Sequence, residues 1–119
     1  MIVPIAASAA YRNKVALAAA NGTAVPRAAW LAFGTGDRAY SPDTDLALQA
    51  EFLRVATTNI VDGSRLTVSG VLLGAATGSH VIREVAVIAS DGTLMGRRVV
   101  APKELEPETE IEFELVFEY

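Results

Sequence analysis

The feature that most constrains the fold is the segment 81–96, which reads as a β-hairpin with two charges inside its first arm. Asp91-Gly92, set between arms rich in Val and Ile, predicts a tight two-residue turn of type I′. Both faces of the first arm are mostly apolar, which is typical of a strand covered on both sides. Arg83 and Glu84 lie in the middle of this arm, and burying either without a partner costs several kcal/mol.

Each of these two charges therefore needs a partner of opposite sign. Arg54 and Arg97 are the candidates for Glu84, whereas Glu51 or a glutamate of the C-terminal segment is the candidate for Arg83. We predict that both pairs form within the subunit, with pairing to a second subunit as the alternative. In either case the hairpin is expected to be structurally central.

Length and composition exclude several classes of protein. At 119 residues the chain is predicted to be one domain, residues 1–119, with a hydrophobic core of its own. No apolar run approaches the roughly 18–20 residues that span a bilayer. The apolar residues at the N-terminus precede the first charges, which is the reverse of a secretory signal. The chain lacks cysteine, so it has no disulfide framework, and we expect it to reside in the cytoplasm or in an assembly built there.

Charge is segregated along the chain, whose net charge is −4. Residues 1–40 carry four Lys and Arg against one Asp, while residues 101–119 carry one Lys against seven Glu. This asymmetry predicts pairing between the two ends, within the subunit or between neighbouring copies. An acidic chain without a basic stripe is not expected to bind nucleic acid, because phosphate neutralisation dominates that affinity.

The residue pattern predicts two helices and several strands. An Ala-rich helix is expected over residues 5–20, ended by Asn21-Gly22, and a second helix is expected to begin at Ser41-Pro42 with Leu48, Phe52 and Val55 as its apolar face. Strands are expected over residues 29–33, 57–61, 65–73 and 110–119, in addition to the hairpin. The predicted class is α+β, with an N-terminal helix and a second short helix packed on a mainly antiparallel β-sheet or sandwich.

Two surfaces are candidate interfaces. Tyr11, Val15 and Ala18 form a thin stripe on the first helix, suited to close packing against its own sheet or against an identical helix. The last strand presents a row of carboxylates, Glu110, Glu112 and Glu114. This row is interpreted either as a solvated face that prevents edge-to-edge aggregation or as a surface complementary to Arg97, Arg98 or a partner's basic patch.

No constellation of residues indicates catalysis, a metal or a cofactor. His80 is the only histidine, and Gly34-Thr35-Gly36-Asp37 lacks the Gly-Lys-Ser/Thr ending of a phosphate-binding loop. Asp43 and Asp45 lack the glycine and distal glutamate of a calcium loop. The serines show no nucleophile-elbow context. We therefore expect a protein that is not an enzyme and that has no cofactor.

Several segments, taken in order, resemble the tail-collar fibre family of tailed bacteriophages. The stretch Ile82 to Ile88, followed by Ser90-Asp91-Gly92-Thr93-Leu94, is similar to the family's "IREIGLFDADGTLI"-like signature, with Ala86 and Ile88 where Gly and Phe are usual. The other similar segments are an early helix with an Asn-Gly exit (residues 16–23), a strand and turn "WLAFGTG" (residues 30–36), an "L..E..R" element (Leu48, Glu51, Arg54) and a "Kp"-like element (Pro102-Lys103).

The resemblance implies a structural protein of the virion tail, assembled in the host bacterial cytoplasm. Its expected role is an adaptor that joins a tail fibre to the baseplate, or a part of the baseplate, present as a homotrimer or as a subunit of a hetero-complex. We expect residues 1–119 to include neither a shaft nor a receptor-binding tip, and to be either a free-standing adaptor or a piece of a longer fibre. The alternative function is a receptor- or carbohydrate-binding module that uses Trp30, Tyr40 and the loop 74–79.

Overall fold

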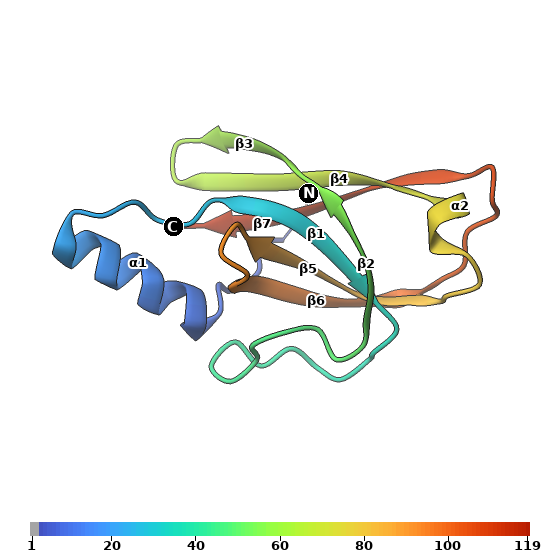
Figure 1. Ribbon diagram of the computed structural model, residues 1–119, viewed down its shortest axis with the longest axis horizontal. Coiled ribbons are helices and arrows are strands. Elements are labelled where there is room, and N and C mark those ends of the chain that lie inside the picture. The colour runs from blue at the N-terminus through green and yellow to red at the C-terminus, as the bar shows by residue number, and fades with distance from the viewer. Residues whose placement is uncertain (1–2) are drawn as a thin grey trace.

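Strand pairing organises the chain into two antiparallel sheets that face each other (Figure 1). The computed structural model describes residues 3–119. One sheet has the order β2-β1-β5-β6, and the other has the order β3-β4-β7. The elements are α1 (Ala9–Asn21), β1 (Ala28–Gly34), β2 (Glu51–Ala56), β3 (Thr58–Asp62), β4 (Arg65–Leu73), α2 (Gly74–Thr77), β5 (Ile82–Ala89), β6 (Leu94–Lys103) and β7 (Glu110–Glu118).

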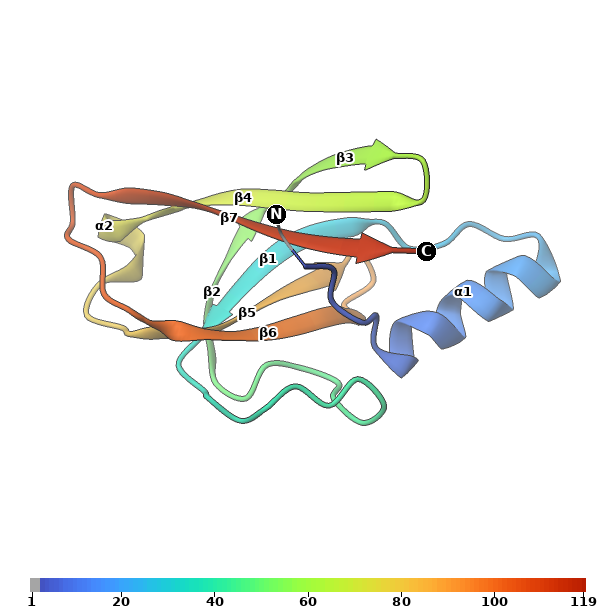
Figure 2. The same cartoon turned by 180° about the vertical axis from the view of Figure 1, so that it is seen from behind.

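The predicted α+β class is confirmed, because two helices accompany antiparallel sheets. The strands expected over residues 29–33, 57–61, 65–73 and 110–119 are present as β1, β3, β4 and β7, each within one or two residues of the expected bounds. The chain passes directly from β2 in one sheet to β3 in the other (Figure 2). The two sheets are thereby tied together at one edge.

The hydrophobic core lies between the inner faces of the two sheets. Period-two alternation in β7 sends Phe113, Leu115 and Phe117 inward and the glutamates outward, as expected for a half-buried strand. Phe33 of β1 meets Phe113 edge-on, with ring centroids 5.0 Å apart at 62°. This geometry is favourable for aromatic pairs.

A second apolar cluster occupies the outer face of the four-stranded sheet. Ala32, Ala86, Ile88 and Leu94 are buried there together with Leu48. Leu48 belongs to the connection between β1 and β2, residues 35–50, which we call the covering loop. The loop lies across this face of the sheet (Figure 1). β5 is therefore covered on both faces, as its sequence predicts.

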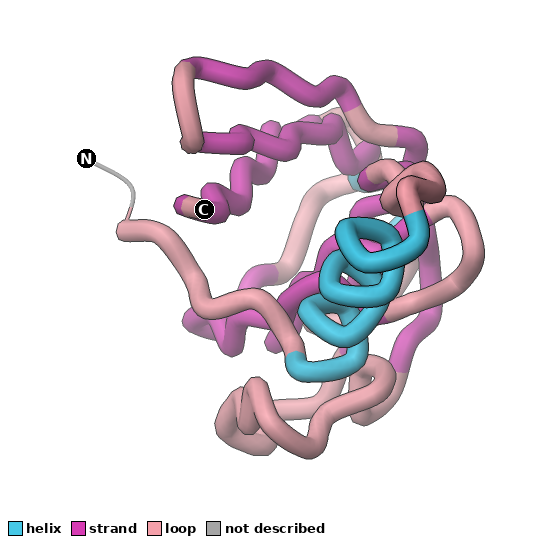
Figure 3. Tube along the Cα trace, turned by 90° about the vertical axis from the view of Figure 1, so that its left-hand side faces the viewer, coloured by secondary structure: helices cyan, strands magenta, loops and turns pink. Residues whose placement is uncertain are grey.

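Helix α1 starts four residues later than expected, because Ser8 caps it and residues 3–8 run along the sheet edges. The Ser8 hydroxyl accepts the N–H of Tyr11 at 3.1 Å and donates to the carbonyl of Leu94. Ile5 N–H donates to the Val116 carbonyl at 2.8 Å, so this extended segment reaches β7 before the helix begins (Figure 3). The expected Asn-Gly exit is confirmed: Gly22 has a φ of +67° and its N–H returns to the Ala18 carbonyl.

The prediction of a helix that begins at Ser41-Pro42 is wrong. Residues 42–44 form only a turn, and the residues expected to continue the helix form β2 instead, paired with β1. The apolar residues 52, 53 and 55 suit a strand that completes the sheet beside β1, and this pairing overrides the local helix signals. The second short helix of the fold is α2, in the glycine-bounded segment for which the sequence predicts a loop.

The prediction of a type I′ turn at Asp91-Gly92 is also wrong. Gly92 has a φ of +91°, but no other residue type in the described part of the chain has a positive φ, so Asp91 does not meet the requirement of that turn. The Gly92 N–H donates to the Ala89 carbonyl at 2.9 Å, and the Ala89 N–H donates to the Thr93 carbonyl at 2.8 Å. The hairpin therefore closes with a three-residue loop and a bulge, which the register shift after Val87 records.

The junction at Ser8 generates the first prediction. Replacing Ser8 with Ala removes the helix cap and leaves the buried Leu94 carbonyl without its donor, so we expect a loss of about 1–3 kcal/mol in the free energy of unfolding. Urea denaturation measures this change. The matched control is Ser79→Ala, an exposed serine whose replacement is expected to change stability by less than about 0.5 kcal/mol. Equal effects of the two substitutions would contradict the role of Ser8.

Candidate functional site

Glu84 is the centre of the site. β5 places its side chain under the covering loop, where it is fully buried. Its Oε2 accepts the N–H groups of Gly36 at 2.9 Å and Ala50 at 2.8 Å. Its Oε1 accepts the N–H of Gln49 at 2.9 Å and the Nε–H of Arg97 at 2.8 Å. Four donors therefore satisfy the carboxylate, and three of them are backbone amides from the two ends of the covering loop.

The glycines after β1 are needed for this arrangement. A Cβ at Gly34 would lie 2.5 Å from Oε2 of Glu84 and 2.6 Å from the Ala50 carbonyl oxygen. A Cβ at Gly36 would lie 2.6 Å from the same Oε2 and 2.4 Å from Cβ of Gln49. Only glycine lets the backbone approach the carboxylate this closely. The segment that superficially resembles a phosphate-binding loop therefore binds the protein's own carboxylate.

Arg97 supplies the charge that balances Glu84, and a second pair extends the network. Arg97 is fully buried, and its Nη1 lies 3.7 Å from Oδ2 of Asp45, which is 4% exposed. Arg38 Nη1 lies 2.9 Å from Oδ1 of Asp45, and Ser41 N–H donates to Oδ2 at 3.0 Å. Neither Nη atom of Arg97 forms a hydrogen bond within residues 3–119, so its contact with Asp45 is a charge interaction. Glu84, Arg97 and Asp45 are thus buried together, and the half-exposed Arg38 of the covering loop extends the alternation of charge to the surface.

The hydrogen bonds determine the ionisation of Glu84. Burial is the largest influence and by itself raises the pKa of the carboxyl, but the Arg97 side chain and the N–H groups of Gln49, Ala50 and Gly36 together outweigh it. The net result is a pKa below the ordinary value of 4.5. Glu84 is therefore a saturated anion, which stabilises the fold and has no lone pair directed at solvent for proton transfer.

The predicted pairing of the hairpin charges is confirmed for Glu84 and not for Arg83. Glu84 pairs with Arg97, the second of its two candidates, inside the subunit. Arg54 pairs with Glu51 instead, through Nε and Oε2 2.5 Å apart, on the exposed edge strand β2. Arg83 is half-buried and joins no ion pair within residues 3–119. The predicted pairing of Arg83 with Glu51 or with a C-terminal glutamate is therefore wrong.

The residues of the first candidate interface lie mostly inside the subunit. Tyr11 is 6% exposed and Ala18 is 5% exposed, while Val15 packs against the central core. The Tyr11 hydroxyl donates to the Pro26 carbonyl at 3.1 Å. This helix stripe packs on its own sheets, which was one of the two alternatives, and it is not a surface for a second copy. Arg97 as an interface residue is likewise wrong, because it is fully buried.

The acidic row of β7 remains on the surface. Glu110, Glu112 and Glu114 are exposed on the outer face of the three-stranded sheet, and none of them joins an ion pair within residues 3–119. Arg98 forms no ion pair with these glutamates; its Nη2 donates a hydrogen bond to the Val3 carbonyl at 2.7 Å. Asp91, from the hairpin motif, is bound by Lys14 of α1 at 3.4 Å.

The other candidates for chemistry are held apart. Asp43 binds Arg12 at 3.0 Å, whereas Asp45 belongs to the buried network, so the Asp-x-Asp pair does not converge on one point. His80 stacks on Phe52, with ring centroids 4.3 Å apart at 7°. No group of three or more His, Asp or Glu residues within residues 3–119 is arranged to hold a metal ion.

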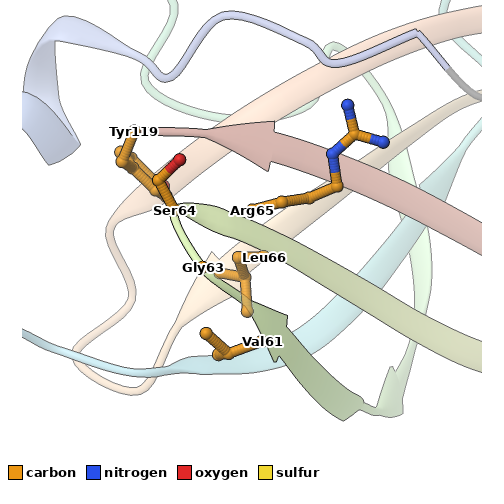
Figure 4. Close-up of a pocket in the computed structure, with 6 residues that line it drawn as sticks. All are labelled: Val61, Gly63, Ser64, Arg65, Leu66 and Tyr119. Atoms are coloured by element: carbon orange, nitrogen blue, oxygen red, sulfur yellow. The ribbon is translucent and has the colours of Figure 1, made fainter.

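One shallow apolar pocket lies at the tip of the β3–β4 hairpin, away from the buried network (Figure 4). Its volume is about 290 Å³, near the lower limit for ligand sites. The residues that line it are Val61, Gly63, Ser64, Arg65, Leu66 and Tyr119. Arg65 is held by Glu118 at 2.9 Å, so the guanidinium is already occupied.

Sequence reasoning missed the partners that the covering loop supplies. The charged centre of β5 signalled that a partner was required, but the backbone amides of Gln49 and Ala50 carry no signal of their own in the sequence. Asp45 and Arg38 lie far from the hairpin along the chain, and nothing in the sequence links either residue to it. The unusual glycine pair at 34 and 36, next to a long irregular connection, was the one available clue.

Comparisons of the chain with protein-family models, with curated proteins and with solved structures found no match. Within the described residues, no helix is long and apolar enough to span a membrane.

The ion pair generates the second prediction. Glu84→Gln keeps the shape of the side chain but leaves Arg97 buried without its counter-charge, so we expect a loss of about 3–5 kcal/mol in the free energy of unfolding. Arg97→Met introduced into that variant is expected to cost at least about 1 kcal/mol less than in the parent protein, because the two residues are coupled. Urea denaturation of the four proteins measures both terms. Glu51→Gln, which breaks the exposed pair with Arg54, is the control and is expected to cost less than about 1 kcal/mol.

The depressed pKa of Glu84 generates the third prediction. A carboxyl whose pKa is lower in the folded state stabilises the protein fully above its unfolded-state pKa, and this contribution is lost as the pH falls through the folded-state value. The parent protein is therefore expected to lose stability as the pH falls below 4.5, the ordinary value for this group. Glu84→Gln is expected to show a shallower dependence in the same range, because the variant lacks this titrating group. Identical slopes for the parent and Glu84→Gln would contradict the assignment.

Proposed function

We propose that the protein is a structural component of a bacteriophage tail, an adaptor that joins a tail fibre to the baseplate or forms part of the baseplate. The observation that carries the proposal is the meeting of three segments that resemble the tail-collar fibre family. Glu84 of the hairpin signature accepts hydrogen bonds from Gly36 of the "WLAFGTG" segment and from Gln49 and Ala50, beside the "L..E..R" element. Segments matched separately in sequence thus form one buried unit, which supports reading them as a single signature.

The surface chemistry also supports an assembly role. The exposed row Glu110, Glu112 and Glu114 presents carboxylates at every second residue, about 6.6–6.8 Å apart along a strand. Such a row is complementary to a basic patch on another tail protein. The carboxylate of the buried Glu84 is saturated with hydrogen-bond donors, so it stabilises the fold and is not available for a reaction. A protein that is not an enzyme accords with this arrangement.

The assembly state that we propose is a homotrimer or a subunit of a hetero-complex. Helix α1 packs on its own sheets through Tyr11 and Ala18, so its buried stripe is not available to a second copy. The exposed face of β7 is the better candidate for the contact. Sedimentation or light scattering of the protein, alone and with its tail partners, measures the mass; a monomer under both conditions would contradict this proposal.

A receptor- or carbohydrate-binding module is the second candidate function, and one observation favours it. Trp30 on β1 is 40% exposed, and an exposed indole is suited to stacking on a sugar ring. Tyr40 is less suited, because its hydroxyl donates to the Ala6 carbonyl at 2.7 Å and burial, followed by the charge of Asp45, raises its pKa to about 12. Binding of the isolated protein to host cells, lost in Trp30→Ala, would favour this function over the adaptor.

The fourth prediction tests the tail role. We expect purified particles of the tailed phage whose genome encodes the protein to contain it. Quantitative mass spectrometry detects the protein in the particles, and immunogold labelling shows whether it lies on the tail. Glu110, Glu112 and Glu114 replaced together by Gln are expected to reduce its incorporation roughly tenfold or more, because a complementary charged surface is lost. The control replaces Glu104, Glu106 and Glu108, in the loop before β7, together by Gln. It changes the net charge by the same amount and is expected to retain incorporation. Absence of the protein from purified virions would refute the function itself.

A further inference from the structure

Two hairpin connections contain nearly the same tripeptide, Asp62-Gly63-Ser64 and Asp91-Gly92-Thr93, in turns of different geometry. In an Asp-Gly pair the glycine nitrogen is able to attack the side-chain carboxyl carbon of the aspartate, because glycine has no side chain to obstruct the approach. The new C–N bond closes a five-membered imide and one water molecule leaves. Solvent water then opens the ring at either carbonyl, which gives back aspartate or gives isoaspartate, in which the main chain runs through the side-chain carboxyl carbon.

We propose that Asp62-Gly63 is a site of isoaspartate formation in the folded protein and that Asp91-Gly92 is protected from it. The reaction is a net isomerisation: the water released on ring closure is balanced by the water consumed on opening, and no oxidant is needed. The two turns share their chemistry, so their difference rests on the contacts that surround them.

The carboxyl of Asp62 has no partner that would hold it. It is exposed at the end of β3, opposite Arg65 in the strand register. Arg65 is directed to the other neighbouring strand, where its Nε and Nη2 lie 3.1 Å and 2.9 Å from Oε2 of Glu118. Within residues 3–119, Asp62 therefore joins neither an ion pair nor a side-chain hydrogen bond.

The attacking nitrogen of Gly63 is also unengaged. It donates no hydrogen bond within the described residues, and no heavy atom lies within 4 Å of the position that a Cβ would occupy. β3 adds little restraint, because all five of its residues are exposed and it pairs only with β4. A short exposed edge strand opens locally at low cost, and such opening allows the peptide to rotate toward the carboxyl.

Both reacting groups of the second turn are held. The Gly92 N–H donates to the Ala89 carbonyl at 2.9 Å, so the nitrogen is tied into the turn. Oδ1 of Asp91 accepts the Thr93 N–H at 3.0 Å, and Oδ2 lies 3.4 Å from Nζ of Lys14. Hydrogen bonds from Thr93 also lower the pKa of Asp91, which reduces the protonated carboxyl that ring closure requires.

Isomerisation at Asp62 has a definite structural consequence. It inserts one carbon atom into the main chain next to a two-residue turn, so the pairing of Asp62 with Arg65 is no longer maintained. Gly63, Ser64 and Arg65 line the apolar pocket, which changes shape with the turn (Figure 4). β4 and β7 pair with each other along the whole of β4, so that part of the sheet is expected to remain intact.

The fifth prediction compares the two turns in one protein. The full chain is incubated at mildly acidic pH and physiological temperature, folded and in concentrated urea, and isoaspartate is quantified at each site by enzymatic methylation and peptide mapping. In the folded protein we expect roughly tenfold or more isoaspartate at residue 62 than at residue 91, because each restraining hydrogen bond at the second turn must first open. In urea we expect the two sites to agree within about twofold, since those contacts are gone.

Two variants and a second measurement complete the test. Asp62→Glu, which would require a slower six-membered ring, is expected to abolish isoaspartate in the peptide that contains residue 62 of the folded protein. Asp91→Glu is expected to leave the isoaspartate of that peptide unchanged. Hydrogen exchange of the aged protein is expected to show faster exchange in β3 and unchanged exchange in β7. Equal isoaspartate at both sites of the folded protein, or more at residue 91, would overturn the proposal.

Discussion

The structure depends on one desolvated carboxylate. Glu84 is removed from water on the outer face of a sheet and is compensated by three backbone amides and one guanidinium group. An irregular connection of 16 residues is thereby fixed in position, although it has no helix or strand of its own. Since an unpaired buried charge costs several kcal/mol, loop, glycines and arginine are energetically interdependent. The apolar cluster under the loop is closed by the same contacts.

The buried network also explains why the outer sheet face does not need a helix to cover it. Many sheets cover their apolar faces with helices, whereas here Leu48 and the polar groups of the covering loop serve that purpose. Polar loop backbone can be buried because its N–H groups find an acceptor on the sheet itself. The cost of placing a carboxylate in a strand is thus offset by the backbone donors that it satisfies.

Much of the fold is predictable from the sequence, because its strands obey simple periodicity. The alternation in 110–118 leads directly to β7, and the Asp62-Gly63 signal predicts a turn before β4, which the structure shows one residue later at Gly63-Ser64. The helix expected after Ser41-Pro42 is absent because pairing with β1 outweighs local capping signals. The site was half predictable: two charges in an apolar strand required partners, and Arg97 was among them. The remaining hydrogen-bond donors to Glu84 are main-chain amides, and the identity of a residue does not indicate where its main-chain amide will point.

The placement of the acidic residues has a consequence for how the molecule approaches a partner. The molecule is elongated, 47 Å by 27 Å by 26 Å, with α1 at one end and the connection from β6 to β7 at the other (Figure 1). At the helix end, Arg12 and Lys14 are matched by Asp43 and Asp91, whereas Glu104, Glu106 and Glu108 at the opposite end join no ion pair within residues 3–119. Unpaired carboxylates therefore gather at the β6–β7 end, and added salt weakens the long-range attraction of these charges to cations.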